Sequence, residues 1–311
     1  MSAFKKILGV LRDPPPEFAF EIAANGIAMS LTGSRNGKSP AAVQHASLPP
    51  GVVAPSPVKE NILDPAAFAE AVRKLVPPST GRGRRAAALI LPDNCVRIAV
   101  LDFDSLPARE EERRPLINFR LRKSVPFDID QAALSYFPQA GKKVIVALAP
   151  SEIVAHYETP FRAAGLHPGL ITVSSLAMLD LLPATGSLVV ARLSPGALTV
   201  IGMKDGVVTI ARSLELAELD AAGDLLAEIV ADIYPTLAYI EDQTGSRPEK
   251  LFIAGFGSES NTSATRLSIE LEIPVEPLSS SVDTDAWPGL AGYLASLMPQ
   301  TAVRSPQKAA A

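Results

Sequence analysis

Residues 89–137 read LILPDNCVRIAVLDFDSLPAREEERRPLINFRLRKSVPFDIDQAALSYF, and the fold is decided here. An apolar run ends at Pro92 and predicts a strand buried on both faces. A second strand over 95–101, a charged helix over 108–123 and a strand over 132–137 follow. The alternation of strand and helix predicts an α/β protein.

The helix expected over 108–123 begins with glutamates and ends with basic residues, as the helix dipole favours. A strand over 143–149 and a helix over 151–164 come next. Together these elements predict a compact α/β unit over 93–165. The chain then returns to the main body through a strand over 169–173 and a helix over 174–182.

The N-terminal part predicts a meander of strands. The runs 18–24 and 27–32 flank Asn25-Gly26, which is a strong hairpin signal. A third strand is expected near 41–47. Asp64 is expected to cap a helix that has Pro65 at its first position, and 86–91 is a buried strand.

The second half repeats this order. Strands are expected over 188–193, 197–203 and 207–213, with a turn at Lys204-Asp205-Gly206. The remaining expected elements are a long helix over 219–242, a strand over 250–254, a helix over 260–271, a strand over 274–277 and a helix over 286–298. Both halves therefore run meander, helix, buried strand.

Composition excludes several classes of protein. The 311 residues carry a net charge of −4, so no basic field argues for nucleic acid. Cys95 is the single cysteine, which excludes an internal disulfide, and the three histidines lack metal-ligand spacing. No apolar run approaches the ~18 residues of a membrane span, and the N-terminus does not resemble a signal peptide.

Residues 1–12 have an apolar stripe flanked by basic residues, followed by a run of prolines. Such a helix can lie on an anionic membrane, or it can pack on its own domain as an ordinary terminal helix. The membrane-facing candidates are Phe4, Lys5, Lys6, Ile7, Leu8 and Leu11.

The order of elements in 89–137, with Ser124-Val125-Pro126-Phe127-Asp128 after the charged helix, resembles the inserted subdomain of the PilM family of type IV pilus assembly proteins. The resemblance implies an actin-like, two-lobed α/β fold. It places an inserted α/β subdomain in the first lobe. Members of the family usually carry a further small subdomain between the second meander and the long helix, but here only a short stretch separates Ser213 from the helix expected over 219–242, so we expect a reduced second lobe. The implied units are an N-terminal segment 1–16, a first subdomain 17–92 plus 166–185, the insertion 93–165, a second lobe 186–298 and a disordered tail 299–311.

Actin-like ATPases hold nucleotide between their lobes, so the resemblance implies where that site would lie. Glu21 occupies the first acidic position, but Ala23 and Ala28 stand where glycine and lysine are expected. The second acidic position falls on Ala191 or Arg192. The residual site would comprise Glu21, Asn25, Gly26, Gly255 and Gly257. These glycines also suit ordinary turns, where tight hairpins demand a positive φ.

We therefore expect no ATP hydrolysis and no cofactor, with ATP binding left open. The resemblance implies a cytoplasmic scaffold at the inner membrane that docks the N-terminal peptide of a PilN-like membrane protein. Motor ATPases and self-association into a ring are further implied partners. Candidate peptide contacts are Arg120, Val125 and Phe127, although aromatic residues here more often form core. The alternatives are an actin-like nucleotide-binding ATPase and a GspL-like component of type II secretion.

Overall fold

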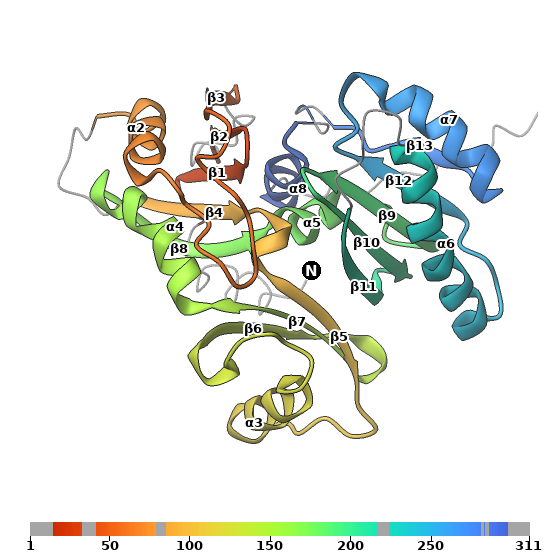
Figure 1. Ribbon diagram of the computed structural model, residues 1–311. Coiled ribbons are helices and arrows are strands. Elements are labelled where there is room, and N and C mark those ends of the chain that lie inside the picture. The colour runs from red at the N-terminus through yellow and green to blue at the C-terminus, as the bar shows by residue number, and fades with distance from the viewer. Residues whose placement is uncertain are drawn as a thin grey trace, which may run out of the picture.

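The computed structural model describes residues 15–32, 42–78, 85–216, 224–280, 283 and 286–297, and within them three β-sheets organise the chain. Two five-stranded sheets form the two lobes, and a three-stranded sheet forms an insertion below them (Figure 1). Short 3₁₀ turns connect several elements: η1 Asp93–Cys95, η2 Ile129–Gln131, η3 Ala140–Lys142, η4 Met178–Leu181 and η5 Gly257–Glu259.

The first-lobe sheet has the order β3-β2-β1-β4-β8. Its strands are β1 Phe18–Ala23, β2 Gly26–Leu31, β3 Gln44–Ser47, β4 Arg85–Leu91 and β8 Leu166–Val173. The first three strands form an antiparallel meander, and β4 and β8 run parallel to β1. Aromatic and aliphatic residues alternate along β1 with Ala19 and Glu21, so each face of the sheet receives its own set of side chains.

The second-lobe sheet has the order β11-β10-β9-β12-β13, which repeats the first. Its strands are β9 Ser187–Ser194, β10 Ala197–Lys204, β11 Val207–Glu215, β12 Lys250–Ala254 and β13 Val275–Pro277. The pairing directions are also repeated: an antiparallel meander is followed by two parallel strands. The duplication predicted from the order of elements is therefore present as two matching sheets.

Helices cover both faces of the first sheet and the outer face of the second (Figure 1). In the first lobe, α2 (Pro65–Leu75) and α4 (Ser151–Ala163) cover the outer face, while α5 (Ser174–Ala177) and α8 (Pro288–Leu297) cover the inner face. In the second lobe, α6 (Leu225–Thr244) and α7 (Ser260–Leu271) pack on the outer face. Asp64 caps α2 with its carboxylate, as predicted.

The insertion is an antiparallel sheet of order β5-β7-β6, with one helix on it. Its elements are β5 Arg97–Asp102, α3 Glu110–Leu121, β6 Ala132–Pro138 and β7 Lys143–Pro150. Ile117 and Leu121 of α3 are buried against the apolar face of this sheet. The other face of the sheet turns toward the lobes, since Ile98 and Ile145 pack with the first-lobe core.

Two helices belong to different parts of the molecule than their place in the sequence predicts. The sequence predicts that the helix over 151–164 belongs to the insertion, but α4 packs on the first-lobe sheet through Tyr157 and Phe161. The resemblance implies that the helix over 286–298 belongs to the second lobe, but α8 packs on α5 and β1 of the first lobe. An apolar helix face shows that a helix is buried without showing which sheet buries it.

The two hairpin turns differ in backbone conformation. Asp205 and Gly206 both have positive φ, which is the expected two-residue hairpin turn. The first hairpin forms between β1 and β2, but a positive φ in its turn was wrongly predicted, because neither Asn25 nor Gly26 has one. Gly26 is instead the first residue of β2, where a Cβ atom would lie 2.9 Å from the Ala46 carbonyl oxygen.

The long helix of the second lobe begins later than predicted. Asp224 caps α6, so the helix starts at Leu225 rather than near 219, and it continues through Pro235. The predicted membrane-facing residues of the N-terminus and the tail 299–311 lie outside the described residues. None of the helices that the structure does describe combines the length and the hydropathy needed to cross a membrane.

Candidate functional site

A buried charge cluster joins the inner faces of the two lobes. Glu21 extends from β1 and Arg192 extends from β9, because each occupies an inward-facing position of its strand. Arg192 Nη2 lies 3.6 Å from Glu21 Oε1. Arg192 also donates from Nη1 to Asp93 Oδ2 at 3.1 Å, and Asp93 begins η1, with one residue between it and the end of β4.

The remaining oxygens of both carboxylates are occupied by the first lobe itself. Ser174 donates its hydroxyl hydrogen to Glu21 Oε1, and the Leu290 backbone N–H donates to Glu21 Oε2 at 2.7 Å. The Ser175 backbone N–H donates to Asp93 Oδ1 at 2.8 Å. The cluster thus ties α5, α8 and both sheets together.

Burial dominates the electrostatics of Glu21. Its side chain is fully buried, and the loss of hydration raises its pKa above the ordinary value. The Arg192 charge and the hydrogen bonds from Ser174 and from the N–H groups of Leu290 and Gly289 lower the pKa, but they do not offset burial. Glu21 therefore binds a proton more tightly than a solvated glutamate does.

This arrangement leaves little capacity for a metal or a phosphate. A hydrated Mg²⁺ site needs free carboxylate oxygens, and a phosphate site needs free backbone N–H groups. Both kinds of group at the cluster have partners inside the protein. Within the described ranges, no group of three His, Cys, Asp or Glu side chains is arranged to hold a metal ion.

Of the predicted nucleotide residues, the structure brings only Glu21 into this cluster. Asn25 is exposed in its turn, and Gly26 packs against β3. Gly255 has a positive φ, and a Cβ atom there would lie 2.1 Å from the Leu193 carbonyl oxygen, so the close approach of the chain requires glycine. Gly257 has a positive φ with open space around it.

Sequence reasoning missed Asp93 and Ser174 as partners of these charges. Two signals were available in the sequence. Asp93 directly follows an apolar strand, and Arg192 interrupts an otherwise apolar one. A charge in a buried strand needs an opposite charge nearby, although the sequence does not say which residue supplies it.

A second feature is an apolar groove of about 390 Å³ between the first lobe and the insertion. One side is formed by β8 residues 171–173, and the other side by residues 133–135 of β6 and 147–149 of β7. Leu91, Val96, Val154 and Leu176 add apolar surface, and Arg114 is the one charged residue in the lining.

Each wall of this groove includes an outermost strand, and β7, the middle strand of the insertion, also contributes to one wall. β8 ends the first-lobe sheet and β6 ends the inserted sheet, so each has a side that pairs with no other described strand. Three consecutive residues of each line the groove, which exposes backbone as well as side chains. Unpaired strand edges can form a ladder with an added extended segment.

The predicted peptide contacts lie outside this groove. Val125 and Phe127 are half-buried against the core of the insertion. The Arg120 guanidinium lies 5.3 Å from the centre of the Phe103 ring and donates to the Asp102 carbonyl oxygen at 3.3 Å. Of the aromatics near the predicted groove, Phe119 and Phe137 are 76% and 67% exposed, so they are not core residues.

No protein-family model and no curated protein matches this sequence, but solved structures do. A chain of the PilM-PilN type IV pilus biogenesis complex matches with a TM-score of 0.72 at 21% identity, over 91% of this chain and 98% of that chain. A protein of Bacteroides thetaiotaomicron with an actin-like ATPase fold and unknown function matches with a TM-score of 0.52 at 12% identity, over 96% and 100% of the chains. These similarities confirm the predicted actin-like fold and its resemblance to a PilM structure.

Proposed function

We propose that this protein is a non-catalytic docking component of a type IV pilus machine. It binds the cytoplasmic N-terminal peptide of a PilN-like membrane protein at the cytoplasmic face of the inner membrane. The observation that carries the proposal is the apolar groove between β8 and β6. The similarity to a chain from a PilM-PilN complex supports the choice of partner.

The groove suits an extended, mostly apolar peptide. Its lining is apolar apart from a few small polar residues and Arg114, and a strand edge lies on each side. A peptide in the extended conformation can pair its backbone with one edge and place alternate side chains in the apolar floor. This position differs from that of the predicted contacts Arg120, Val125 and Phe127, and it lies between the first lobe and the insertion.

The ion-paired cluster supports the absence of catalysis. The acidic position Glu21 is buried with Ser174 and α8 as its partners, and a cation, Arg192, stands in the region where a second acidic residue is expected. Removing Arg192 to admit Mg²⁺ would leave the Asp93 carboxylate buried without its counter-ion, which typically costs about 3–5 kcal/mol. Nucleotide hydrolysis would therefore have to break up the contact between the lobes.

Calorimetric titration of the partner's N-terminal peptide tests the docking site. Ser135 is exposed and lines the groove, so Ser135→Arg should fill the groove with a long charged side chain and leave the fold intact. We expect this variant to weaken peptide binding at least tenfold. Gln131→Arg adds the same charge at an exposed position just before β6 and outside the groove, and it should bind like wild type.

Equal binding by wild type and Ser135→Arg would show that the peptide binds elsewhere. Melting curves of both variants exclude an effect on folding. The catalytic part is tested separately by phosphate release from Mg-ATP. A turnover that disappears in Glu21→Gln, which keeps the shape of the side chain and one of its two accepting oxygens, would overturn the claim that the protein is not an ATPase.

A further inference from the structure

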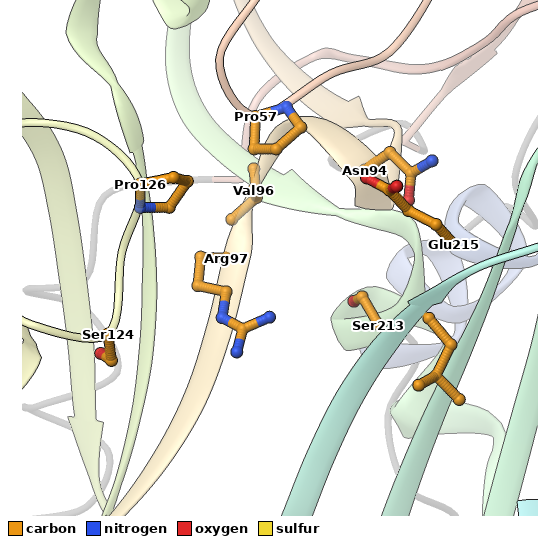
Figure 2. Close-up of a pocket in the computed structure, with 9 residues that line it drawn as sticks. Pro57, Asn94, Val96, Arg97, Ser124, Pro126, Ser213 and Glu215 are labelled. Atoms are coloured by element: carbon orange, nitrogen blue, oxygen red, sulfur yellow. The ribbon is translucent and has the colours of Figure 1, made fainter. Parts of the chain in front are cut away.

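A separate pocket lies where the first lobe, the insertion and the second lobe meet (Figure 2). Its volume is about 300 Å³, at the small end of the range for ligand sites. It occupies an opening between β5 and β11, and Figure 2 shows Arg97 reaching from β5 toward β11. Its lining residues are Pro57, Asn94, Val96, Arg97, Ser124, Pro126, Ser213, Leu214 and Glu215.

The two strands beside this opening are both outermost strands. β11 begins the order of the second sheet, and β5 begins the order of the inserted sheet. Near the far end of these strands, the Gln139 side-chain amide exchanges two hydrogen bonds with the backbone of Val208, at 2.9 and 3.1 Å. Gln139 lies between β6 and β7, so these bonds join β11 to the insertion at that end, and the pocket lies at the other end of β11, where Arg97 and Ser213 line it.

The opening exposes the backbone of β11. Three consecutive residues, 213–215, line the pocket, and their side toward β10 is already paired. The other side pairs with no described strand. An extended segment entering the pocket would find this unpaired edge along one wall.

Among the described residues, the charged side chains of the pocket have no partner. The Arg97 guanidinium forms no hydrogen bond or ion pair with any of these residues, and the same holds for the side chains of Asn94 and Glu215. Arg97 and Glu215 also form no ion pair with each other. A guanidinium that has no counter-ion among the described residues, and that lies beside Val96 and Pro126, is suited to a carboxylate with an apolar neighbour.

We propose that this pocket binds an extended segment of a partner protein that carries an acidic side chain. The segment adds to the free edge of β11, and its carboxylate pairs with the Arg97 guanidinium. Glu215 and Asn94 face the backbone N–H groups or a basic residue of the same segment. The site is distinct from the groove between β8 and β6, and Val96 is the one described residue that lines both.

The test uses isotope-labelled full-length protein and nuclear magnetic resonance. The probe is an acetylated and amidated heptapeptide of alternating valine and threonine with one central glutamate. We expect it to shift the amide resonances of residues 94–97 and 213–215, and to bind at least tenfold more tightly than the same peptide with glutamine. Arg97→Ala should remove this preference, and Arg73→Ala, which removes an exposed arginine from α2, should retain it.

Four results would overturn the proposal. The first is equal affinity for the glutamate and glutamine peptides, and the second is an undiminished preference in Arg97→Ala. The third is the absence of shifts at these residues with millimolar peptide. If succinate binds as tightly as the peptide, the pocket is a small-molecule site and the proposed partner segment is wrong.

Discussion

Glu21 and Arg192 show how buried charged residues can connect two lobes. The two carboxylate oxygens of Glu21 accept hydrogen bonds from Ser174 and from the N-terminal turn of α8. Arg192 extends from the second lobe and pairs with Asp93 of the first. These contacts join the two lobes through charged side chains.

The pH dependence of stability tests this environment. The pKa of Glu21 is higher in the folded protein than in the unfolded chain, where it is near 4.5. The resulting stabilisation is complete below pH 4.5 and is lost as the pH rises through the folded-state pKa, by about 1.4 kcal/mol for each unit between the two values. Urea unfolding should therefore show wild type losing stability relative to Glu21→Gln as the pH rises from 4.5 to 8. Parallel profiles for the two proteins would contradict the raised pKa.

At the scale of elements, α8 is the part whose position was predicted least well. Its sequence predicts a buried helix, and its neighbours could be found only from the structure. Two glycines, Gly289 and Gly292, let α8 approach α5 and η4 so closely that a Cβ atom at Gly292 would lie 2.1 Å from the Ala177 carbonyl oxygen. The surface on which α8 packs also includes small residues of β1, β2 and β4, namely Ala19, Ala28 and Ala88.

Gly292→Ala should destabilise the protein, although alanine favours a helix over glycine by up to about 1 kcal/mol. The new methyl group meets backbone atoms that cannot move independently, so overpacking should dominate, with a net loss of about 1–3 kcal/mol. Gly169→Ala is the control, because the nearest atom would be 4.0 Å away and the site is exposed. It should stay within about 0.5 kcal/mol of wild type in urea unfolding. Equal stability of the two variants would mean that α8 does not need this close contact.

At the scale of the whole molecule, the repeated order of strands could be predicted from the sequence, because each element carries its own pattern. The meanders were predicted in this way, whereas the insertion after β4 was expected from the resemblance to the PilM family as well as from the pattern. The contacts between parts could not be predicted. The partners of Arg192 and the two grooves depend on how three sheets are placed, and no local pattern encodes that placement.

The central claim is that this molecule binds a peptide without using nucleotide, and one measurement tests it most directly. The N-terminal peptide of the PilN-like partner is titrated into the full-length protein without nucleotide, with Mg-ADP and with Mg-ATP. Because the lobes are already joined by the cluster around Arg192, the account predicts a peptide Kd that is the same in all three conditions within about twofold. A Kd that changes about fivefold or more between ADP and ATP, or binding that requires ATP, would contradict it.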